Sequence, residues 1–453
     1  MKQTTEALYQ KREKIQPRYV DGYYQQLRRY TRWLTVGIYF ILPWLRWAGH
    51  PLILFDVHNR KFYIFSYTFW PQDLFLLVLL ILIAALTLFF FTTLAGRLWC
   101  GYTCPQTVWI NIFIWIEYQL EGDRNKRIKL DKSPWGAEKI IKRGSKHTLW
   151  LLFAFITALT LGGYFQPIYL LIDKILHWQQ SGWDTFWIVF FTLATYVNAG
   201  WMREQICLYM CPYARFQSVM YDQKTLIIAY DVDRGEPRGA RKKNIDPKSK
   251  GLGHCIQCQK CVQVCPTGID IRDGLQMACI GCAACIDVCD DVMQKMHYPK
   301  GLIRYQTGES GKNMQSLLRP RLVTYGVLLI SLVLLLSYLL IERTPLRLDV
   351  IRDRNQLYSV TTEEQIKNTY LLKVMNLTQQ RKHYQISVSS PIQSTFVGAK
   401  KITLLPGEIA NLPVSLLIDE DLLKQPKTNI AFKVCEISNE KQCVITESRF
   451  IYL

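Results

Sequence analysis

The sequence predicts a multi-domain membrane protein, in which an α-helical bundle of about five transmembrane helices carries a small cysteine-rich module and a C-terminal immunoglobulin-like β-sandwich. Three observations predict this fold class. Several long segments contain no charged residue, one spacing of four cysteines occurs twice in succession, and the last stretch alternates apolar and polar residues between Pro and Gly turns. The 453 residues are enough for about three domains.

The uncharged segments predict the transmembrane helices. Four of them approach the roughly 20 residues that cross a bilayer as a helix, at residues 74–96, 148–172, 185–202 and 322–341. A fifth segment, 33–48, contains Pro43 and Arg46. An arginine near a helix end can extend to the lipid headgroups, so this segment is also expected to span, with an interfacial helix as the alternative.

The distribution of basic residues predicts the topology. The net charge is +19, and lysines and arginines gather before the first span and in the connections 97–147 and 203–321, whereas the alternate connections carry almost none. By the positive-inside rule, the N-terminus and both basic connections are cytoplasmic, and five spans place the C-terminal region outside. This distribution favours a lipid bilayer as the partner of the basic residues and gives no support to nucleic acid.

A repeated cysteine motif predicts two iron–sulfur clusters. The spacing C-x2-C-x2-C-x3-C occurs twice between residues 255 and 289 and is typical of bacterial two-cluster ferredoxins, in which the fourth cysteine of each motif binds the other cluster. The alternatives are a disulfide framework or zinc, but zinc does not require a third and a fourth cysteine in each motif. The expected ligands are Cys255, Cys258, Cys261 and Cys289 for one [4Fe–4S] cluster (cluster 1) and Cys279, Cys282, Cys285 and Cys265 for the other (cluster 2).

Two further cysteine pairs follow the second and fourth predicted spans. Both have the form C-x3-C-P, with Cys100 and Cys104 before Pro105, and Cys207 and Cys211 before Pro212. A spacing of four puts both thiols on one helix face, and the proline breaks the helix at the second cysteine. We interpret two spans followed by such a dithiol as an internal duplication. Soft thiols favour Cu(I), zinc or an iron–sulfur core, and buried structural cysteines are the alternative.

The C-terminal stretch beyond residue 342 predicts an antiparallel β-sandwich of immunoglobulin-like type, with nothing that looks catalytic. Cys435 and Cys443 flank a short turn outside the cytoplasm, where a disulfide is the main interpretation and an external copper-binding thiol pair is the alternative. The predicted domains are a cytoplasmic arm (1–32), a membrane domain of four spans in two repeats (33–220), a basic linker (221–254), the ferredoxin module (255–300), a linker (301–321), the fifth span (322–341) and the periplasmic domain (342–453).

These motifs in this order resemble one family over essentially the whole chain. The segments WCGYTCPQTVW and ICLYMCPYARFQ, the paired cluster motifs and the C-terminal β-sandwich resemble the cytochrome c oxidase accessory proteins called CcoG, RdxA or FixG. The resemblance implies a multi-pass protein of the bacterial cytoplasmic membrane that reduces Cu(II) to Cu(I) for the copper centre of the cbb-type oxidase. It implies copper at Cys100, Cys104, Cys207 and Cys211.

The expected partners follow from this hypothesis. They are a cytoplasmic electron donor, copper chaperones or an exporter, and oxidase assembly factors. Two other functions stay open: a non-enzymatic copper-binding assembly scaffold, and electron transfer to the quinone pool or another membrane partner. The sequence also leaves open whether the four membrane thiols hold a third cluster and whether they form one site or two. A homo-oligomer stays open as well.

Overall fold

The computed structural model describes residues 14–452 except 48–49, 66, 223, 244–246, 308–318, 345, 354–355, 362–364, 379 and 424. The chain divides into two compact units. The first comprises Met1–Trp44 and Leu77–Val333, and the second comprises Leu45–Leu76 and Leu334–Leu453. Residues 1–13 of the predicted N-terminal arm, and residues 308–318 of the predicted linker 301–321, lie outside the described residues.

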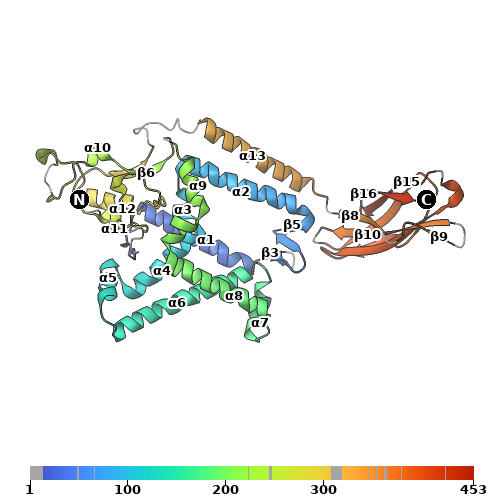
Figure 1. The fold of residues 1–453 in the computed structure, drawn as a ribbon, viewed down its shortest axis with the longest axis horizontal. Helices are drawn as coiled ribbons and strands as arrows, with labels where there is room; N and C mark the ends of the chain where they lie inside the picture. Colours follow the sequence, from blue (N-terminus) through green and yellow to red (C-terminus); the bar gives the residue numbers. More distant parts are fainter. Residues whose placement is uncertain are drawn as a thin grey trace, which may run out of the picture. The chain divides into compact units, whose positions relative to one another are not determined.

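The first unit begins with a set of helices (Figure 1). They are α1 (Tyr23–Ile41), α2 (Leu74–Ala95), α3 (Leu98–Tyr102), α4 (Pro105–Glu121), α5 (Arg124–Lys132), α6 (Ala137–Gly162), α7 (Ile168–Leu176), α8 (Gly182–Thr195) and α9 (Pro212–Met220), with π-helical turns at Tyr196–Met202 and Ile206–Met210. Helices α4 and α6 and the first π-helical turn share a core that includes Phe113, Trp150 and Ala199.

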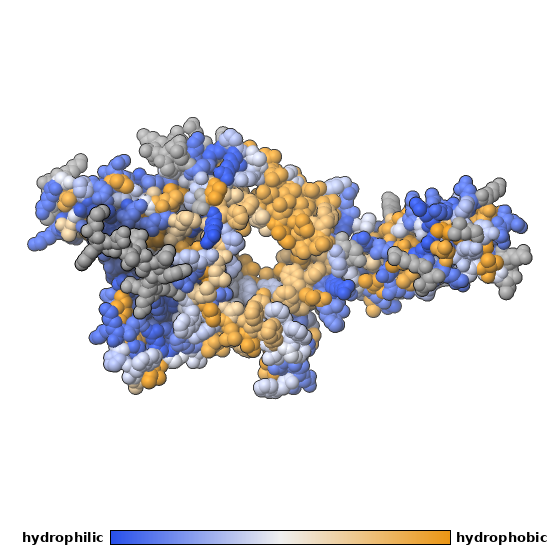
Figure 2. All heavy atoms as spheres, viewed as in Figure 1, coloured by the Kyte–Doolittle hydropathy of each residue, from blue (hydrophilic) through white to orange (hydrophobic). Residues whose placement is uncertain are grey.

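Two helices in the described part of the chain are long and apolar enough to cross a membrane. They are α2 and α13 (Pro320–Ile341), with mean hydropathies of 3.2 and 2.4. Figure 2 shows hydrophobic residues gathered over both helices. A hydrophobic surface of this extent in water is unfavourable, so it indicates association with a membrane. The bundle of five spans remains a prediction.

The other predicted spans have different boundaries. Helix α1 begins at Tyr23, before predicted residue 33, and ends at Ile41, since Pro43 cannot continue the hydrogen-bond ladder. The segment expected at 148–172 divides into α6 and α7 at Gly162–Gly163, before Pro167. The segment expected at 185–202 changes from α-helix to π-helix at Tyr196.

The cysteine-rich module is larger than predicted. Strand β6 (Ile227–Tyr230) pairs antiparallel with β7 (Ile303–Gln306), and both contribute to a core that contains Cys255 and Cys261. The module's helices are α10 (Val232–Gly235), α11 (Lys260–Gln263) and α12 (Ala284–Lys295). The expected linkers 221–254 and 301–321 are therefore wrong as boundaries, because their apolar strands close the module's core.

The second unit contains the predicted β-sandwich. One sheet has the order β12–β14–β10–β8, with β9 also on β10, and the other has the order β13–β11–β15–β16. The strands are β8 (Leu346–Arg352), β9 (Ser359–Val360), β10 (Gln365–Asn376), β11 (Lys382–Ser389), β12 (Thr395–Val397), β13 (Lys401–Leu404), β14 (Ile409–Asp419), β15 (Lys427–Glu436) and β16 (Asn439–Ile451). Alternate residues such as Tyr370, Leu416 and Phe432 fill the space between the sheets.

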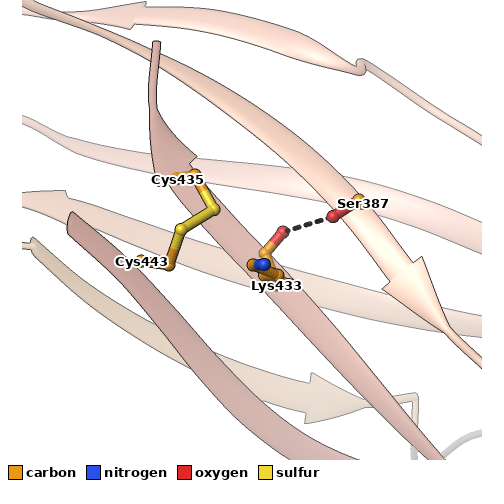
Figure 3. Close-up of a disulfide and its surroundings, with 4 residues drawn as sticks. All are labelled: Ser387, Lys433, Cys435 and Cys443. Atoms are coloured by element: carbon orange, nitrogen blue, oxygen red, sulfur yellow. Dashed lines mark hydrogen bonds between the residues drawn. A yellow bond between two sulfur atoms is a disulfide. The ribbon is translucent and has the colours of Figure 1, made fainter. Parts of the chain in front are cut away.

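A disulfide joins β15 to β16 in this domain. Cys435 and Cys443 are directly opposite in the antiparallel register, with Cα atoms 4.1 Å apart, and their sulfur atoms are bonded (Figure 3). Beside it, the Ser387 hydroxyl on β11 donates to the carbonyl of Lys433, 3.3 Å away. The bond joins neighbouring strands of one sheet, so it fixes their register.

A small antiparallel sheet in the second unit precedes α2. Its strands are β3 (Ile53–Asp56), β4 (Lys61–Ile64) and β5 (Tyr67–Phe69), beside the short pair β1 (Arg46–Trp47) and β2 (His50–Pro51). Lys61 Nζ donates to the carbonyl of Gly407 at 2.8 Å, and Arg343 pairs with Asp73 at 2.5 Å. These contacts join the sheet to the β-sandwich within one unit.

Candidate functional site

The two cysteine motifs of the module fold into matching loops. Gln257 and Gln259 in the first motif have φ of 56° and 53°, and Gly281 and Ala283 at the same places in the second have φ of 68° and 59°. Three residues with side chains thus adopt the left-handed conformation, which is uncommon outside glycine and is seen where the surrounding structure requires it. The sequence repeat is therefore a repeat of backbone conformation.

Each loop opens onto a small cavity whose cysteines match one predicted ligand set. One cavity is lined by Cys255, Cys258, Cys261 and Cys289. The other is lined by Cys265, Cys279, Cys282 and Cys285, with Cys261 on its wall. Each cavity thus takes three thiols from one motif and the fourth from the other, so the residues fit two [4Fe–4S] clusters with crossed ligands.

The thiols around these cavities are not close enough together to form a metal-binding site for a single ion. Across the described ranges, no three His, Cys, Asp or Glu side chains are close enough together to hold a metal ion, so the fit rests on the sulfur-lined cavities. Burial raises the pKa of Cys261 and Cys279 to about 11, and that of Cys289 to about 12. Cluster binding would therefore displace protons from these thiols.

The two C-x3-C-P motifs share a helix break at the second cysteine. Cys100 lies in the short helix α3, and Cys104 lies directly before α4, which begins at Pro105. Likewise, Cys207 lies in the π-helical turn Ile206–Met210, and Cys211 lies directly before α9. Proline is well tolerated at the first helical position because its missing N–H has no acceptor there. The helix therefore breaks at the second cysteine, as the motif predicts.

The four thiols of these motifs lie within electrostatic reach of one another. Burial raises the pKa of Cys207 to about 12, and the neighbouring thiols of Cys104, Cys100 and Cys211 also raise it. Burial likewise raises the pKa of Cys100 to about 11, while a hydrogen bond with Gln217 opposes this shift. The Gln217 side chain is fully buried, and its Nε2 lies 3.5 Å from Cys100 Sγ. The raised pKa values therefore favour the protonated thiol at Cys100 and at Cys207.

The cluster 2 loop packs directly on the first of these motifs. A Cβ atom on Gly101 would lie 2.7 Å from the carbonyl oxygen of Gly281, so the two backbones touch. Cys100 packs against the apolar cluster that contains Ile280 and Cys282. The first dithiol and the predicted ligands of cluster 2 therefore share one packed contact.

Polar contacts hold this junction in place. Arg97, which is buried, donates from Nη1 to the carbonyl of Cys279 at 3.0 Å and from Nη2 to that of Ala214 at 2.8 Å. The Tyr305 hydroxyl on β7 donates to the carbonyl of Gly281 at 3.2 Å. One guanidinium thus bridges the cluster 2 loop and α9.

Cys207 approaches cluster 2 across a small cavity rather than by direct packing. This cavity is lined by Cys207 on one side and by Thr267 and Ile280 on the other. The Thr267 hydroxyl lies 3.3 Å from Sγ of Cys265, a predicted ligand of cluster 2. The first cysteines of both motifs therefore face the same cluster.

The docking of the module onto α1 has no signal in the sequence. Asp287 on α12 accepts hydrogen bonds from the backbone N–H groups of Tyr24 at 3.2 Å and Gln25 at 2.8 Å. It therefore caps the N-terminus of a helix that lies far away in the chain. Gly22 leaves the necessary space, because a Cβ atom there would lie 2.4 Å from the Asp287 side chain.

A buried ion cluster beside the thiols was also missed. Glu117 is fully buried and pairs with Arg203 at 2.9 Å, Arg127 at 3.3 Å and Lys14 at 2.9 Å. Burial alone would raise the pKa of Glu117, but Arg203, Lys14 and Lys146 outweigh it and hold this pKa well below its ordinary value. The sequence around Glu117 gives no hint of these distant partners.

Comparisons with known proteins agree with the cluster motifs. Residues 202–308 match a family model described as a 4Fe-4S dicluster domain, and residues 77–117 match one described as a 4Fe-4S binding domain. Residues 336–452 match the IG-like fold at the C-terminal of FixG. With the two sulfur-lined cavities, these matches define the class: the chain is a membrane-associated iron–sulfur protein of electron transfer with two [4Fe–4S] clusters.

The relatives define the family. Protein RdxB of Cereibacter sphaeroides is 42% identical over 401 residues, which cover 85% of this chain and 84% of that protein. Nitrogen fixation protein FixG of Rhizobium meliloti is 35% identical over 87% of this chain and 83% of its own length. The chain belongs to the FixG/RdxA family. The crystal structure of a FixG-related protein from Vibrio parahaemolyticus, 41% identical, covers 24% of this chain and 97% of that chain, with a TM-score of 0.23.

Proposed function

We propose that this chain is a cupric reductase that converts Cu(II) to Cu(I) at the thiols of Cys100, Cys104, Cys207 and Cys211, and supplies Cu(I) for the copper centre of the cbb-type cytochrome c oxidase. One observation carries the proposal: Cys100 packs against the apolar cluster that contains Cys282, a ligand of cluster 2. The clusters, when bound, supply single electrons, which suit a one-electron metal couple.

The protein's own residues have distinct parts in this proposal. The four thiols hold the copper substrate and, as soft ligands, favour Cu(I) over Cu(II). Gln217 orients the thiol of Cys100. Among the cluster ligands Cys258 is exposed, which suits entry of electrons from a cytoplasmic donor beside cluster 1. Cu(II) gains one electron from this donor, and the Cu(I) passes to a chaperone or exporter.

The proposal includes a topology. The N-terminus and the clusters lie in the cytoplasm, and the C-terminal domain lies in the periplasm of a multi-pass protein. The disulfide of Cys435 and Cys443 is consistent with an oxidising compartment on that side, whereas the cluster cysteines need a reducing one.

An anaerobic reduction experiment tests the proposed activity. The purified protein is reduced until its cluster absorbance bleaches, excess reductant is removed, and Cu(II) is added with a Cu(I)-specific chromophore. We expect cluster reoxidation to match the appearance of Cu(I). The variant with all four of Cys100, Cys104, Cys207 and Cys211 changed to Ala should retain both clusters and lose the activity, while a Cys435→Ser/Cys443→Ser control retains it. Clusters that stay reduced while copper binds would instead favour an assembly scaffold.

A third cluster at the four membrane thiols is the second candidate. It is favoured by the match of residues 77–117, which include Cys100 and Cys104, to a 4Fe-4S binding domain. Iron and labile sulfide per chain separate the two, because copper as substrate leaves the content of two clusters, whereas this alternative requires that of three. The four-alanine variant would lose one cluster's worth of iron only in the second case.

A further inference from the structure

An arginine-rich cavity lies between the N-terminal arm, α1, α4 and the cluster 2 loops. Its volume is about 460 Å³, and five arginines line it: Arg18, Arg28, Arg29, Arg32 and Arg127. No Asp or Glu is among its described lining residues. Glu117 pairs with Arg127 and Asp21 with Arg29, whereas among the described residues no carboxylate pairs with Arg18, Arg28 or Arg32. Three such cations around one cavity are unfavourable unless an anion neutralises them.

Several guanidinium nitrogens of these arginines lack hydrogen-bond partners within the part of the chain that the structure describes. Arg28 is only 9% exposed, and its Nη2 is buried without a partner. Arg127 is 1% exposed, and its Nε likewise has none, as does Nε of Arg32. Buried donors are normally satisfied, and arginine matches the oxygens of a phosphate especially well. These donors therefore point to a phosphate-bearing ligand.

The rim of the cavity indicates what carries this phosphate. Trp33 and Trp115 line it and are 55% and 46% exposed, as expected of aromatic residues at the level of lipid headgroups. Beyond Trp33, helix α1 exposes Leu34, Ile38 and Ile41, which share one face by their spacing. Acyl chains would cover this apolar face, whereas a soluble phosphate would leave it exposed to water.

We propose that this arginine-rich cavity binds the phosphate headgroup of an anionic phospholipid, whose acyl chains lie along the exposed apolar face of α1. Basic pockets at the cytoplasmic end of transmembrane helices suit such headgroups.

Occupation of the cavity should affect cluster 2. Val264, Pro266 and Ala284 also line the cavity, and they are the chain neighbours of Cys265 and Cys285. A bound anion offsets the arginine charges beside these ligands, so it makes addition of an electron to cluster 2 less favourable. Bound anionic lipid therefore lowers the reduction potential of this cluster.

The experiment uses the full-length protein in nanodiscs of phosphatidylglycerol or phosphatidylcholine. Bound lipid is counted by native mass spectrometry, and the cluster potentials are measured by redox titration. We expect retention of phosphatidylglycerol over phosphatidylcholine and a lower potential of one cluster in phosphatidylglycerol. Equal retention and equal potentials in the two lipids would overturn the proposal. Inorganic phosphate added to the phosphatidylcholine sample separates the sources, since full reproduction of the effect by free phosphate would overturn the assignment to a lipid.

A charge-matched pair of variants locates the effect. Arg18→Gln/Arg32→Gln removes two lining charges and leaves the protein contacts of Arg28 and Arg127 intact. It should lose retained phosphatidylglycerol and the lipid dependence of the potential. Lys129→Gln/Lys132→Gln removes two exposed charges outside the cavity and should keep both. If the double variant, with cluster absorbance intact, binds lipid like the native chain, the cavity is not the site; if it does not fold, the comparison of the two lipids on the native chain still decides.

Discussion

Replacement of Gly101 by Ala tests the contact between the cluster 2 loop and the first dithiol. The added Cβ would lie 2.7 Å from the carbonyl oxygen of Gly281 and 3.1 Å from that of Ile280. Both atoms belong to the backbone, so the loop itself must move. Overpacking of this kind costs about 1–3 kcal/mol. Against this, Ala in place of Gly gains at most about 1 kcal/mol of helix propensity, and α3 is short.

We therefore expect a net loss of up to about 3 kcal/mol and an opened junction. Thermal unfolding followed by cluster absorbance measures the first effect. Alkylation of Cys100, quantified by peptide mass spectrometry, measures the second, because this thiol now packs against the apolar cluster at the loop. The melting temperature should fall, and the alkylation rate of Cys100 should rise.

Gly144→Ala is the matched control for this substitution. Gly144 lies within α6, and a Cβ atom there would meet nothing within 4 Å. This change should be neutral or stabilise by up to about 1 kcal/mol and leave Cys100 protected. If Gly101→Ala behaves like Gly144→Ala in both measurements, the loop does not rest on α3, and the packed route between cluster 2 and the dithiol is refuted.

Three further predictions concern other parts of the chain. Glu117→Gln should cost about 3–5 kcal/mol in chemical denaturation, because it leaves buried cations unpaired. The pKa of Glu117 is lower in the folded chain than in the unfolded chain, where it is about 4.3. The stabilisation of the fold by this carboxylate is therefore fully present above that unfolded pKa and is lost as the pH falls toward the folded pKa. Acid titration of the native chain should lower the unfolding free energy only below about pH 4. Cys289→Ser should perturb the electron paramagnetic resonance signal of the cluster bound by the first motif, and Cys265→Ser that of the other, whereas uncrossed ligands would give the reverse. Reduction of the Cys435–Cys443 bond, which closes a short loop of sequence separation 8, should lower the unfolding free energy of the C-terminal domain by about 2–3 kcal/mol and leave cluster absorbance unchanged.

Features that depend on local spacing were predictable from the sequence. The crossed ligand sets are predicted from the three-residue offset of the fourth cysteine, and the four cysteines of each predicted set line one cavity. The breaks after Cys104 and Cys211 follow from the missing N–H of proline. The alternation of apolar and polar residues in the C-terminal strands predicted the β-sandwich, because a pleated strand points successive side chains to opposite faces.

Features that depend on long-range contacts were not predictable. Strands β6 and β7 pair across the whole cysteine region, so the short apolar run at Ile227–Tyr230 looks like part of a linker when it is seen alone. Asp287 caps α1 across 262 residues of chain. The residues next to Asp287 in α12 do not indicate that its carboxylate accepts hydrogen bonds from the backbone of α1. Such contacts need the folded chain, since one sequence without its relatives shows no pairing between distant positions.

The two C-x3-C-P motifs also differ at one position whose meaning appears only with the structure. The residue after the first cysteine is Gly101 in the first motif and Leu208 in the second. Only the glycine allows backbone contact with the cluster 2 loop, and Cys207 faces the same loop across a cavity. The two dithiols are therefore packed differently, and the first has the shorter packed route to the cluster 2 loop. Under the proposed function, electrons should therefore reach the copper substrate through Cys100, and the second pair should serve mainly to hold the ion.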